Sequence, residues 1–380
     1  MTAYYIDATA GSDSNGGTSQ VDAKQTLGAG IALLSSPGDI LYVKNNGSYV
    51  LTSTNTMNKI GTSTGGRYRI EGYTTTPGAR DGRPTITSST NSVILFSLTP
   101  SSYCDFVHLK LTHTAATRGA AFEANGGANS QNNRWIDCVI DGCANGIKGG
   151  TSAFTTNVIE RCEIKNCTGS GCLVSGNYTG CWIHDNAGYG INVSYADFCI
   201  ENCIISGNTN HGFYDSTGAG SSETMLISGN TFYNNNGDGI RQNSDYARMP
   251  WLIKNNVFYS NAGYGINLVN LNTSGKIDGC PRTIMYNAYG SNTSGATNGV
   301  ESSETGAVTL TGDPFTNAGS GDFSLNNTAG AGAALRAAGF PGTMPGGTTT
   351  GYHDIGVAQH ADPASSGTPV RVVIQNIGTY

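Results

Sequence analysis

The stretch Trp135-Ile136-Asp137-Cys138-Val139-Ile140 opens a pattern that returns along the chain and decides the fold. The returns align residue for residue: Ile159–Ile164, Tyr178–Ile183, Ile200–Ile205, Ile227–Phe232 and Ile253–Phe258. The fourth position is always cysteine or asparagine: Cys138, Cys162, Cys181, Cys203, Asn230 and Asn256. The sixth position is apolar throughout, and each repeat closes on a glycine followed by an apolar residue, as in Gly146-Ile147. Such a repeat indicates a solenoid, in which each turn packs on its neighbours.

The spacing of the repeats favours a solenoid of strands over one of helices. The fourth position recurs after 19 residues (162 to 181) at the shortest and 27 (203 to 230) at the longest, which is shorter than most helical repeats. Short β-branched runs broken by Asn-Gly and Gly-Asn pairs predict strands and turns. We expect three short strands per turn of chain, stacked in parallel about 4.8 Å apart. Asparagine side chains would then form hydrogen-bonded ladders along the stack.

These columns resemble those of the right-handed parallel β-helix proteins, the pectate-lyase-like superfamily, over roughly residues 1–360. The entry and exit segments resemble the ends of the same proteins: Tyr4–Asp7, Gly11–Thr18, Pro37–Val43, Asp313–Phe315, Gly321–Leu325 and Asp354–Val357. The resemblance implies an all-β fold, a single-stranded right-handed parallel β-helix with an N-terminal capping helix and a loose C-terminal wrap. We expect one structural domain with three parts: an entry strand and helix (1–39), the β-helix (40–289), and an irregular cap with a final strand (290–380).

The two ends carry their own signals. Apolar residues at helical spacing between Asp22 and Ser36 predict the capping helix, which Pro37-Gly38 would end. Residues 369–377 predict a last strand, which either closes the coil or pairs with a neighbouring subunit.

Composition excludes several classes of partner. The net charge is −6 and there is no basic run, so we expect no nucleic acid. No apolar run approaches the length of a membrane span, so we expect no membrane insertion. No signal peptide is visible in residues 1–20. We interpret this either as removal of a signal or as a protein that never needed one, such as a virion protein assembled in the host cytoplasm.

The ten cysteines favour buried thiols over disulfides or metal ligands. Cys138, Cys162, Cys181 and Cys203 share one inward column, where cysteine acts as a small hydrophobic residue. One or two disulfides stay open as an alternative. A zinc site is disfavoured because no Cys-x-x-Cys pair is present.

Two columns near the closing glycine hold the candidate functional residues. They read Asn145, Ser170, Tyr189, His211, Asp238, Tyr264 and Lys148, Leu173, Asn192, Tyr214, Arg241, Asn267. On adjacent turns, His211, Asp238 and Arg241 are candidates for acid–base catalysis on a sugar. Candidates for carbohydrate binding, partly from the longer loops of these turns, are Tyr189, Tyr214, Tyr264, Asp245, Tyr246 and Arg248. The plainer interpretation, solvated residues at turns, stays open, and we expect His108, His113, His184, His353 and His360 to be ordinary surface residues.

The resemblance also implies what a lyase of this group would need. Its members that act on uronic acids hold Ca²⁺ with several carboxylates and use an arginine or lysine base. The outward column Asp137, Arg161, Gly180, Asn202, Gly229, Asn255 stacks no acids on adjacent turns. We therefore expect no metal site and no cofactor, with Ca²⁺ needed only if the protein is a lyase.

These observations lead to three hypotheses about function. The leading one is a non-enzymatic structural protein of a virion surface, a capsid decoration or tail-spike-like element that touches glycans. The alternative is a secreted polysaccharide lyase or hydrolase acting on an acidic polysaccharide, and the third is a bacterial surface adhesin. The expected location is the virion surface or the extracellular space. Expected partners are a glycan and other virion or surface proteins, and a homo-trimer is one assembly that the resemblance allows.

Overall fold

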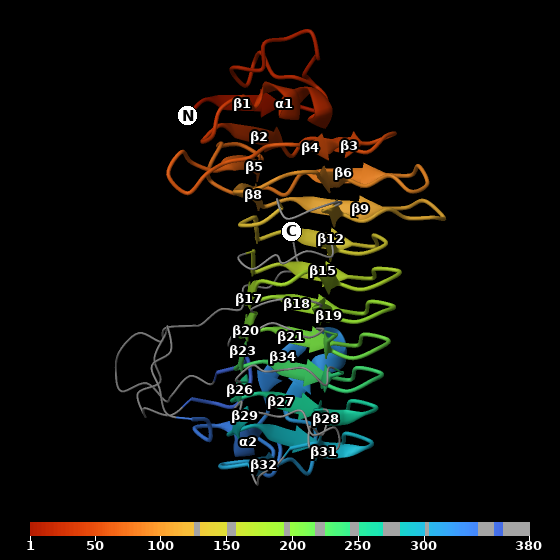
Figure 1. Ribbon diagram of the computed structural model, residues 1–380, viewed down its shortest axis with the longest axis vertical. Coiled ribbons are helices and arrows are strands. Elements are labelled where there is room, and N and C mark those ends of the chain that lie inside the picture. Colours follow the sequence, from red (N-terminus) through yellow and green to blue (C-terminus); the bar gives the residue numbers. More distant parts are fainter. Residues whose placement is uncertain are drawn as a thin grey trace, which may run out of the picture. The chain divides into compact units, whose positions relative to one another are not determined.

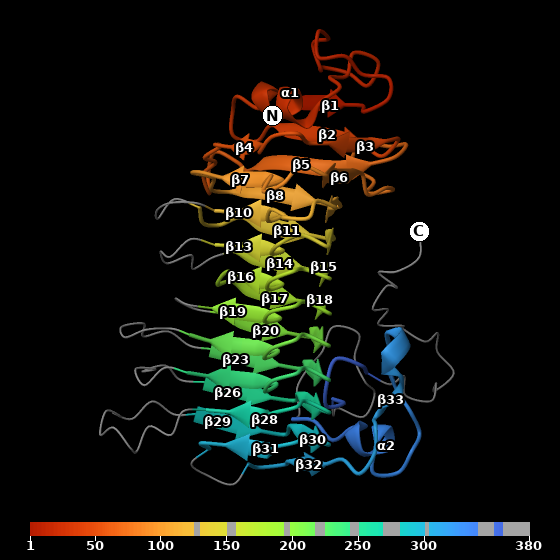
Figure 2. The ribbon, with the colours of Figure 1, turned by 90° about the vertical axis from the view of Figure 1, so that its right-hand side faces the viewer.

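The computed structural model describes residues 1–124, 130–149, 157–193, 198–216, 225–243, 251–268, 282–300, 304–340 and 353–359. The chain forms two compact units, Met1–Asp197 and Phe198–Tyr380. Within each unit, successive strands of one turn belong to three different parallel sheets (Figures 1 and 2). We name these sheets A, B and C in the order in which the chain visits them.

The first unit holds the longer set of strands. Its sheet A consists of β1 (Ala3–Ile6), β2 (Ile40–Lys44), β5 (Tyr68–Tyr73), β8 (Cys104–Val107), β11 (Arg134–Ile136), β14 (Val158–Glu160) and β17 (Asn177–Thr179). Sheet B consists of β3 (Ser48–Val50), β6 (Thr85–Ser88), β9 (Lys110–His113), β12 (Val139–Asp141), β15 (Glu163–Lys165) and β18 (Trp182–His184). Sheet C consists of β4 (Thr56–Met57), β7 (Phe96–Leu98), β10 (Phe122–Glu123), β13 (Ile147–Lys148), β16 (Cys172–Leu173) and β19 (Ile191–Val193).

The second unit repeats the arrangement. Its sheet A consists of β20 (Cys199–Glu201), β23 (Met225–Ser228), β26 (Trp251–Lys254) and β29 (Arg282–Met285). Sheet B consists of β21 (Ile204–Ser206), β24 (Thr231–Tyr233), β27 (Val257–Tyr259), β30 (Ala288–Gly290) and β32 (Val308–Thr309). Sheet C consists of β22 (Phe213–Asp215), β25 (Ile240–Gln242), β28 (Tyr264–Asn267) and β31 (Gly295–Asn298).

The pairing register confirms the alignment of the repeats. In the first unit Trp135 pairs with Ile159, and Ile140 pairs with Ile164. In the second unit Ile227 pairs with Ile253. Buried and outward side chains alternate along strands such as β14, β23 and β26, because successive residues of a strand point to opposite faces. A slip of one residue would exchange the two sets, so burial fixes the register.

From β8 onward, one corner of each turn has a left-handed backbone. The residue between sheets A and B there has a φ angle between 50° and 69°: His108, Asp137, Arg161, Gly180, Asn202, Gly229, Asn255 and Tyr286. Such a conformation costs a residue other than glycine about 1–2 kcal/mol. The reversal places these side chains outward, one above another within each unit, while the next residue turns into the core.

That next residue forms the predicted ladder, and cysteine and asparagine fill it in the same way. In the second unit the Asn256 side-chain amide donates to the Ile227 carbonyl oxygen of the preceding turn, at 3.0 Å. In the first unit the Cys162 thiol donates to the equivalent carbonyl oxygen, that of Trp135, at 3.4 Å. Asparagine adds an acceptor, since Asn256 Oδ1 receives the Asn230 backbone N–H at 2.9 Å. Either residue type can therefore occupy this column, because both donate to the equivalent carbonyl oxygen of the preceding turn.

The cysteine prediction is confirmed for the described residues. Nine of the cysteines are thiols, and eight of them are buried, with Cys199 partly exposed. Cys280 lies outside the described residues. Burial raises the pKa of the Cys138, Cys162 and Cys172 thiols well above the usual range, as expected of cysteines that pack rather than react.

The capping helix is present but shorter than predicted. Helix α1 (Leu27–Leu33) starts at Thr26, whose hydroxyl accepts the Ala29 N–H, and it ends where Leu34 becomes extended. Lys24 instead bridges to Ile6 in β1, so the apolar spacing at Ala23 reflects burial without helix. A side chain at Gly30 would collide with Ile6 and Leu41, which shows how closely α1 covers the first coil.

The C-terminal part of the chain both extends and covers the second unit. Parallel strands continue past Tyr289 into β31 and β32, so the repeats run further than the expected limit at residue 289. The antiparallel hairpin β33 (Phe315–Asn317) and β34 (Asp322–Leu325) encloses the 3-10 turn η2 (Ala318–Ser320) and is followed by α2 (Gly332–Leu335). Phe315 and Phe323 pack edge-on against Tyr233 of sheet B. The predicted strand at 369–377 lies outside the described residues.

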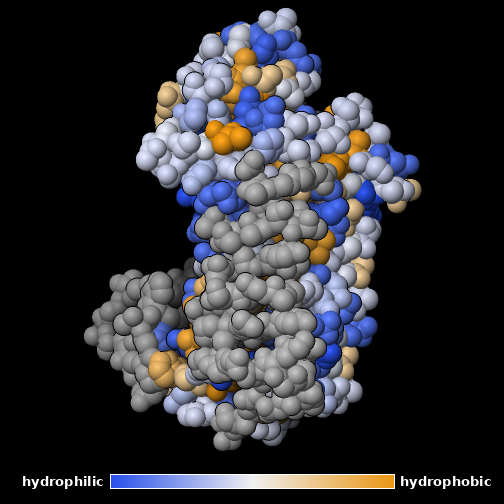
Figure 3. Space-filling model, in the orientation of Figure 1, coloured by the Kyte–Doolittle hydropathy of each residue, from blue (hydrophilic) through white to orange (hydrophobic). Residues whose placement is uncertain are grey.

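The surface carries little continuous apolar area on the face drawn in Figure 3, where the hydrophobic residues outside the grey atoms form small separate groups. No helix among the described residues is long and apolar enough to cross a membrane.

Candidate functional site

The candidate residues of the second unit form a row on the outer face of sheet C. Strand pairing places Tyr214 beside Arg241, and Arg241 beside Asn267. The alternate residues Phe213, Ile240 and Ile266 are fully buried, so this row faces outward. We call His211, Tyr214, Asp238, Arg241 and Asn267 the outer strip. It crosses β22, β25 and β28, a distance of about 10 Å at the usual strand spacing.

Asp238 holds the outer strip together. Its Oδ1 accepts the Tyr264 backbone N–H at 2.6 Å, and its Oδ2 accepts the Asn267 side-chain amide at 3.0 Å. Arg241 Nη1 and His211 Nδ1 lie 3.6 Å and 3.5 Å from Oδ2. Asp238 is only 4% exposed. Both oxygens of this carboxylate are therefore engaged by protein groups, and the carboxylate orients the neighbouring side chains.

His211 is held as an uncharged imidazole. Its Nδ1 accepts the Asp238 backbone N–H at 2.8 Å, which assigns the ring proton of the neutral form to Nε2. Burial, assisted by Arg241, lowers the pKa of His211 although the Asp238 carboxylate opposes this. The ring lies nearly parallel to that of Tyr214, with centroids 5.5 Å apart. At neutral pH the strip thus offers one guanidinium cation, a neutral donor and two stacked rings.

The predicted site residues are brought together in part. His211, Tyr214, Asp238 and Arg241 do lie on adjacent turns, and Tyr264 joins them through its backbone. Tyr189 occupies the equivalent position in the first unit, where its N–H donates to the Ser170 hydroxyl. Asp245, Tyr246 and Arg248 lie outside the described residues. Asp215, the last residue of β22, is fully buried. The catalytic and binding roles of all these residues stay predictions.

A calcium site does not fit the outer strip. Ca²⁺ takes several carboxylate or carbonyl oxygens, whereas both oxygens of Asp238 already accept protein hydrogen bonds. Among the described residues, no three His, Cys, Asp or Glu side chains are grouped as metal ligands would be.

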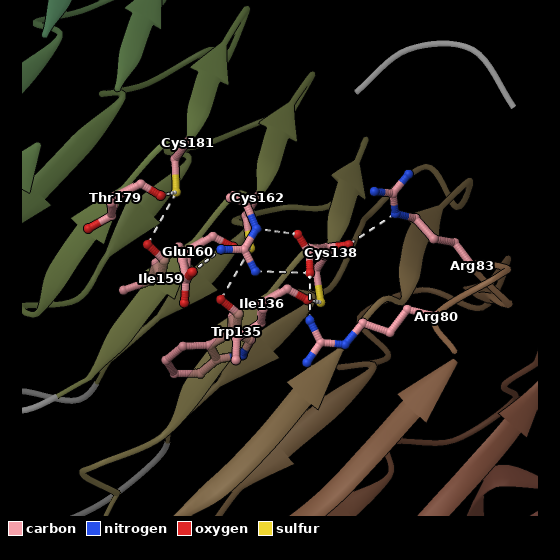
Figure 4. Close-up of polar contacts among 12 residues, drawn as sticks. Arg80, Arg83, Trp135, Ile136, Cys138, Ile159, Glu160, Cys162, Thr179 and Cys181 are labelled. Atoms are coloured by element: carbon pink, nitrogen blue, oxygen red, sulfur yellow. Dashed lines mark hydrogen bonds and ion pairs between the residues drawn. The ribbon is translucent and has the colours of Figure 1, made fainter. Parts of the chain in front are cut away.

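A second polar cluster, missed by the sequence analysis, lies at a left-handed corner of the first unit. We call Arg80, Arg83, His108, Asp137 and Arg161 the arginine corner. Asp137 Oδ1 accepts from Arg161 Nε at 2.7 Å, and Asp137 Oδ2 lies 3.2 Å from both Arg80 Nη1 and Arg161 Nη2. Arg83 Nε donates to the Asp137 carbonyl oxygen at 3.0 Å. In Figure 4, Arg80 and Arg83 approach from one side of the group and Glu160 lies on the other.

The outward column predicted from the repeat includes Asp137 and Arg161, but the search for stacked acids in it does not detect this cluster. The sequence signal for this cluster is the pair Arg80 and Arg83. Both lie in the loop between β5 and β6, one turn before the corner at His108. A stacked fold brings such a loop beside the next corners, but loop geometry is not encoded in the repeat.

The expectation that the histidines are surface residues is wrong for three of them. His113, His184 and His353 are buried. His113 Nε2 lies 3.2 Å from the Val93 carbonyl oxygen. His184 lies between Glu163 and Asp185, at 3.3 Å and 2.7 Å. The partners come from other loops or from neighbouring residues, which a search for side chains at ligand spacing does not detect. His360 lies outside the described residues.

Comparison with known proteins agrees with the geometry. A family model described as "Right handed beta helix region" matches residues 181–281. The fold is similar to that of the pectate lyase Pel9A, with a TM-score of 0.67 and 17% identity over 94% of this chain and 96% of that one. It is also similar to the A-module of the mannuronan C-5 epimerase AlgE4 from Azotobacter vinelandii, with a TM-score of 0.54 and 13% identity over 85% and 86%.

A rhamnogalacturonan lyase gives a TM-score of 0.52 and 16% identity over 83% of this chain and 91% of that one. No curated protein matches the sequence. At these identities the likeness establishes the fold alone. With its three parallel sheets and the matched family region, the chain has the right-handed parallel β-helix fold.

Proposed function

We propose that this protein binds an acidic polysaccharide along the outer strip of its second unit. The observation that carries the proposal is the buried Asp238 carboxylate, which sets Arg241 and His211 beside Tyr214 on one outward face. Burial of the Asp238 carboxylate costs desolvation energy, so its presence at this position needs an explanation. Orienting a recognition surface supplies one.

The chemistry of the strip matches a uronic acid. Arg241 can pair with a sugar carboxylate through two parallel hydrogen bonds. The exposed part of Tyr214 can pack on the apolar face of a sugar ring. The His211 ring lies nearly parallel to that of Tyr214 and so extends this aromatic surface.

The relatives in fold support the class of ligand by analogy only. A pectate lyase, a mannuronan epimerase and a rhamnogalacturonan lyase share the fold and are named for work on polysaccharides. The same scaffold serves many functions. The weight of the proposal therefore rests on the residues of the strip.

The setting that we propose is a surface exposed to glycans. A virion surface protein, a capsid decoration or tail-spike-like element, fits a protein that recognises a polysaccharide without modifying it. A bacterial adhesin would use the strip in the same way. In either setting the protein would assemble with other surface proteins or as a homo-trimer.

Binding is tested with soluble pectate, alginate and a neutral glucan by isothermal titration. We expect the acidic polymers to bind and Arg241→Gln to weaken binding by about 10–100-fold, the worth of one charged hydrogen-bonded pair. Arg118→Gln is the matched control, because this arginine of the first unit lies outside both clusters and contacts the Asn166 carbonyl oxygen. Equal affinity of the wild type and Arg241→Gln would overturn the proposal.

The second candidate is a lyase or hydrolase acting on the same polymer, favoured by the neutral His211 next to Tyr214. β-Elimination needs a base that removes the proton beside the sugar carboxylate while the glycosidic oxygen leaves and is protonated. The Nδ1 atom of His211 is engaged by the Asp238 N–H, so His211 is arranged to donate and not to abstract. We therefore rank binding first. Release of unsaturated sugars from any acidic polymer, measured by ultraviolet absorbance and lost in His211→Asn, would reverse this order.

A further inference from the structure

The arginine corner concentrates positive charge around one carboxylate. Asp137 Oδ2 contacts both Arg80 and Arg161, Asp137 Oδ1 contacts Arg161, and the Arg161 guanidinium also contacts Glu160. Arg80 lies 3.9 Å from Glu71, which is already paired with Arg69 at 2.9 Å. The acids of this corner are thus used to hold the guanidinium groups in place.

Arg83 differs from its neighbours because it has no carboxylate partner among the described residues. Among the described residues, its one hydrogen bond is that from Nε to the Asp137 carbonyl oxygen, at 3.0 Å. In Figure 4 the rest of its guanidinium is directed away from the group. A guanidinium carries five N–H donors in a planar fork, so the outer edge of Arg83 presents donors suited to an oxyanion.

His108 gives a second and independent sign of an incomplete site. Its Nδ1 is buried and has no hydrogen-bond partner among the described residues. Burial, together with the nearby Arg83, lowers the pKa of His108 to about 4. A buried polar atom left unpaired costs about 1–3 kcal/mol, and an imidazole beside guanidinium groups gains most from an added anion.

We propose that the outer edge of Arg83 in the arginine corner binds an oxyanion, a carboxylate or sulfate group of an acidic polysaccharide, beside His108. The ligand would give Arg83 a partner for its remaining donors. Asp137 would position Arg83 through its carbonyl oxygen. The identification of the carrier as a polysaccharide rests on the proposed function, whereas binding of the oxyanion itself does not.

The test follows the His108 imidazole by NMR as pH is varied, in sodium sulfate and in sodium chloride at equal ionic strength. The His108→Asn variant assigns the signal. An anion within a few ångströms stabilises the imidazolium, so we expect sulfate to raise the pKa of His108 by about 1. Arg83→Gln should remove this response, and Arg83→Lys, which keeps the charge, should restore part of it. Arg118→Gln should respond as the wild type does.

A wild-type protein without a sulfate response, or an Arg83→Gln variant with an unchanged one, would overturn the site. A short oligouronate added in place of sulfate identifies the carrier: the same rise in pKa supports a polysaccharide, and a response to sulfate alone contradicts it. Arg241→Gln separates the two proposals, because it should weaken binding at the outer strip and leave the His108 response intact.

Discussion

At the residue scale, the left-handed corners decide which side chains reach the surface together. The outward column predicted from the repeat includes Asp137, and the removal of a surface group usually changes stability by no more than about 0.5 kcal/mol. The structure contradicts this, because Asp137 pairs with Arg80 and Arg161 and is only 17% exposed in its side chain. Its register was predictable from the repeat, but the loop that supplies Arg80 was not.

Replacing Asp137 should therefore be measurably destabilising. We expect Asp137→Asn to lower the free energy of unfolding by about 1 kcal/mol, since part of the pairing is screened by solvent. Asparagine tolerates the left-handed backbone, so the loss reports the charge and not the corner. Glu201→Ala, on the outer face of sheet A in the second unit, is the control and should stay within about 0.5 kcal/mol. Denaturant unfolding measures both, and equal values would contradict the role given to Asp137.

His108 makes a prediction about pH. The pKa of its folded form is about 4, below the usual 6.5, so the unfolded chain takes up the proton first as pH falls. Stability from the neutral His108 is complete above about pH 6.5 and is lost progressively as pH falls towards 4. The titration of His108 should lower the free energy of unfolding by about 1–3 kcal/mol over this range. This contribution to the pH dependence should be absent in His108→Asn. Unfolding at pH 7 and pH 4.5 checks this, and an identical pH dependence in the two proteins would refute it.

At the element scale, each turn consists of three short strands whose ends are fixed by ladders. The ladder of the second unit ends on Glu304, whose Oε1 accepts the Asn287 N–H and side-chain amide at 2.7 Å and 2.8 Å. The carboxylate thus takes the place of the next asparagine. In the first unit the equivalent carbonyl oxygens accept hydrogen bonds from thiols, which are weaker donors than amides: those of Cys138, Cys162 and Cys181.

This equivalence can be tested at Cys162. We expect Cys162→Asn to cost less than about 1.5 kcal/mol, because the amide can donate to the Trp135 carbonyl oxygen as the thiol does. Cys162→Asp should cost several kcal/mol, since it buries a carboxylate that cannot donate to that carbonyl. Thermal unfolding compares them. Similar losses in the two variants would show that this position does not face the core ladder.

The repeat made most of the elements predictable and little of what covers them. The columns from Cys138 onward gave strand register, inward cysteines and the adjacency of His211, Asp238, Tyr214 and Arg241, because stacking turns sequence spacing into contact. The length of α1 was overestimated, since the apolar residue Ala23 is buried by a bridge near β1 and not by a helix. The partners of His113 and His184 depend on how loops and neighbours pack, which no periodicity records.

At the scale of the whole molecule, the proposed binding of an acidic polysaccharide would use polar groups on the outer faces of both units of the β-helix. Both clusters share one design, in which a carboxylate positions arginines that remain partly exposed: Asp238 with Arg241, and Asp137 with Arg80 and Arg161. A net charge of −6 would otherwise repel such a polymer. Binding should therefore depend on these local clusters and weaken as salt is raised.

The most direct measurement is a crystal structure of the protein grown with a short oligouronate. The account predicts density for sugars on the outer face of β22, β25 and β28, with a sugar carboxylate within hydrogen-bond distance of Arg241 and a ring packed on Tyr214. An oligosaccharide bound elsewhere, with the outer strip bare at saturating concentration, would contradict it.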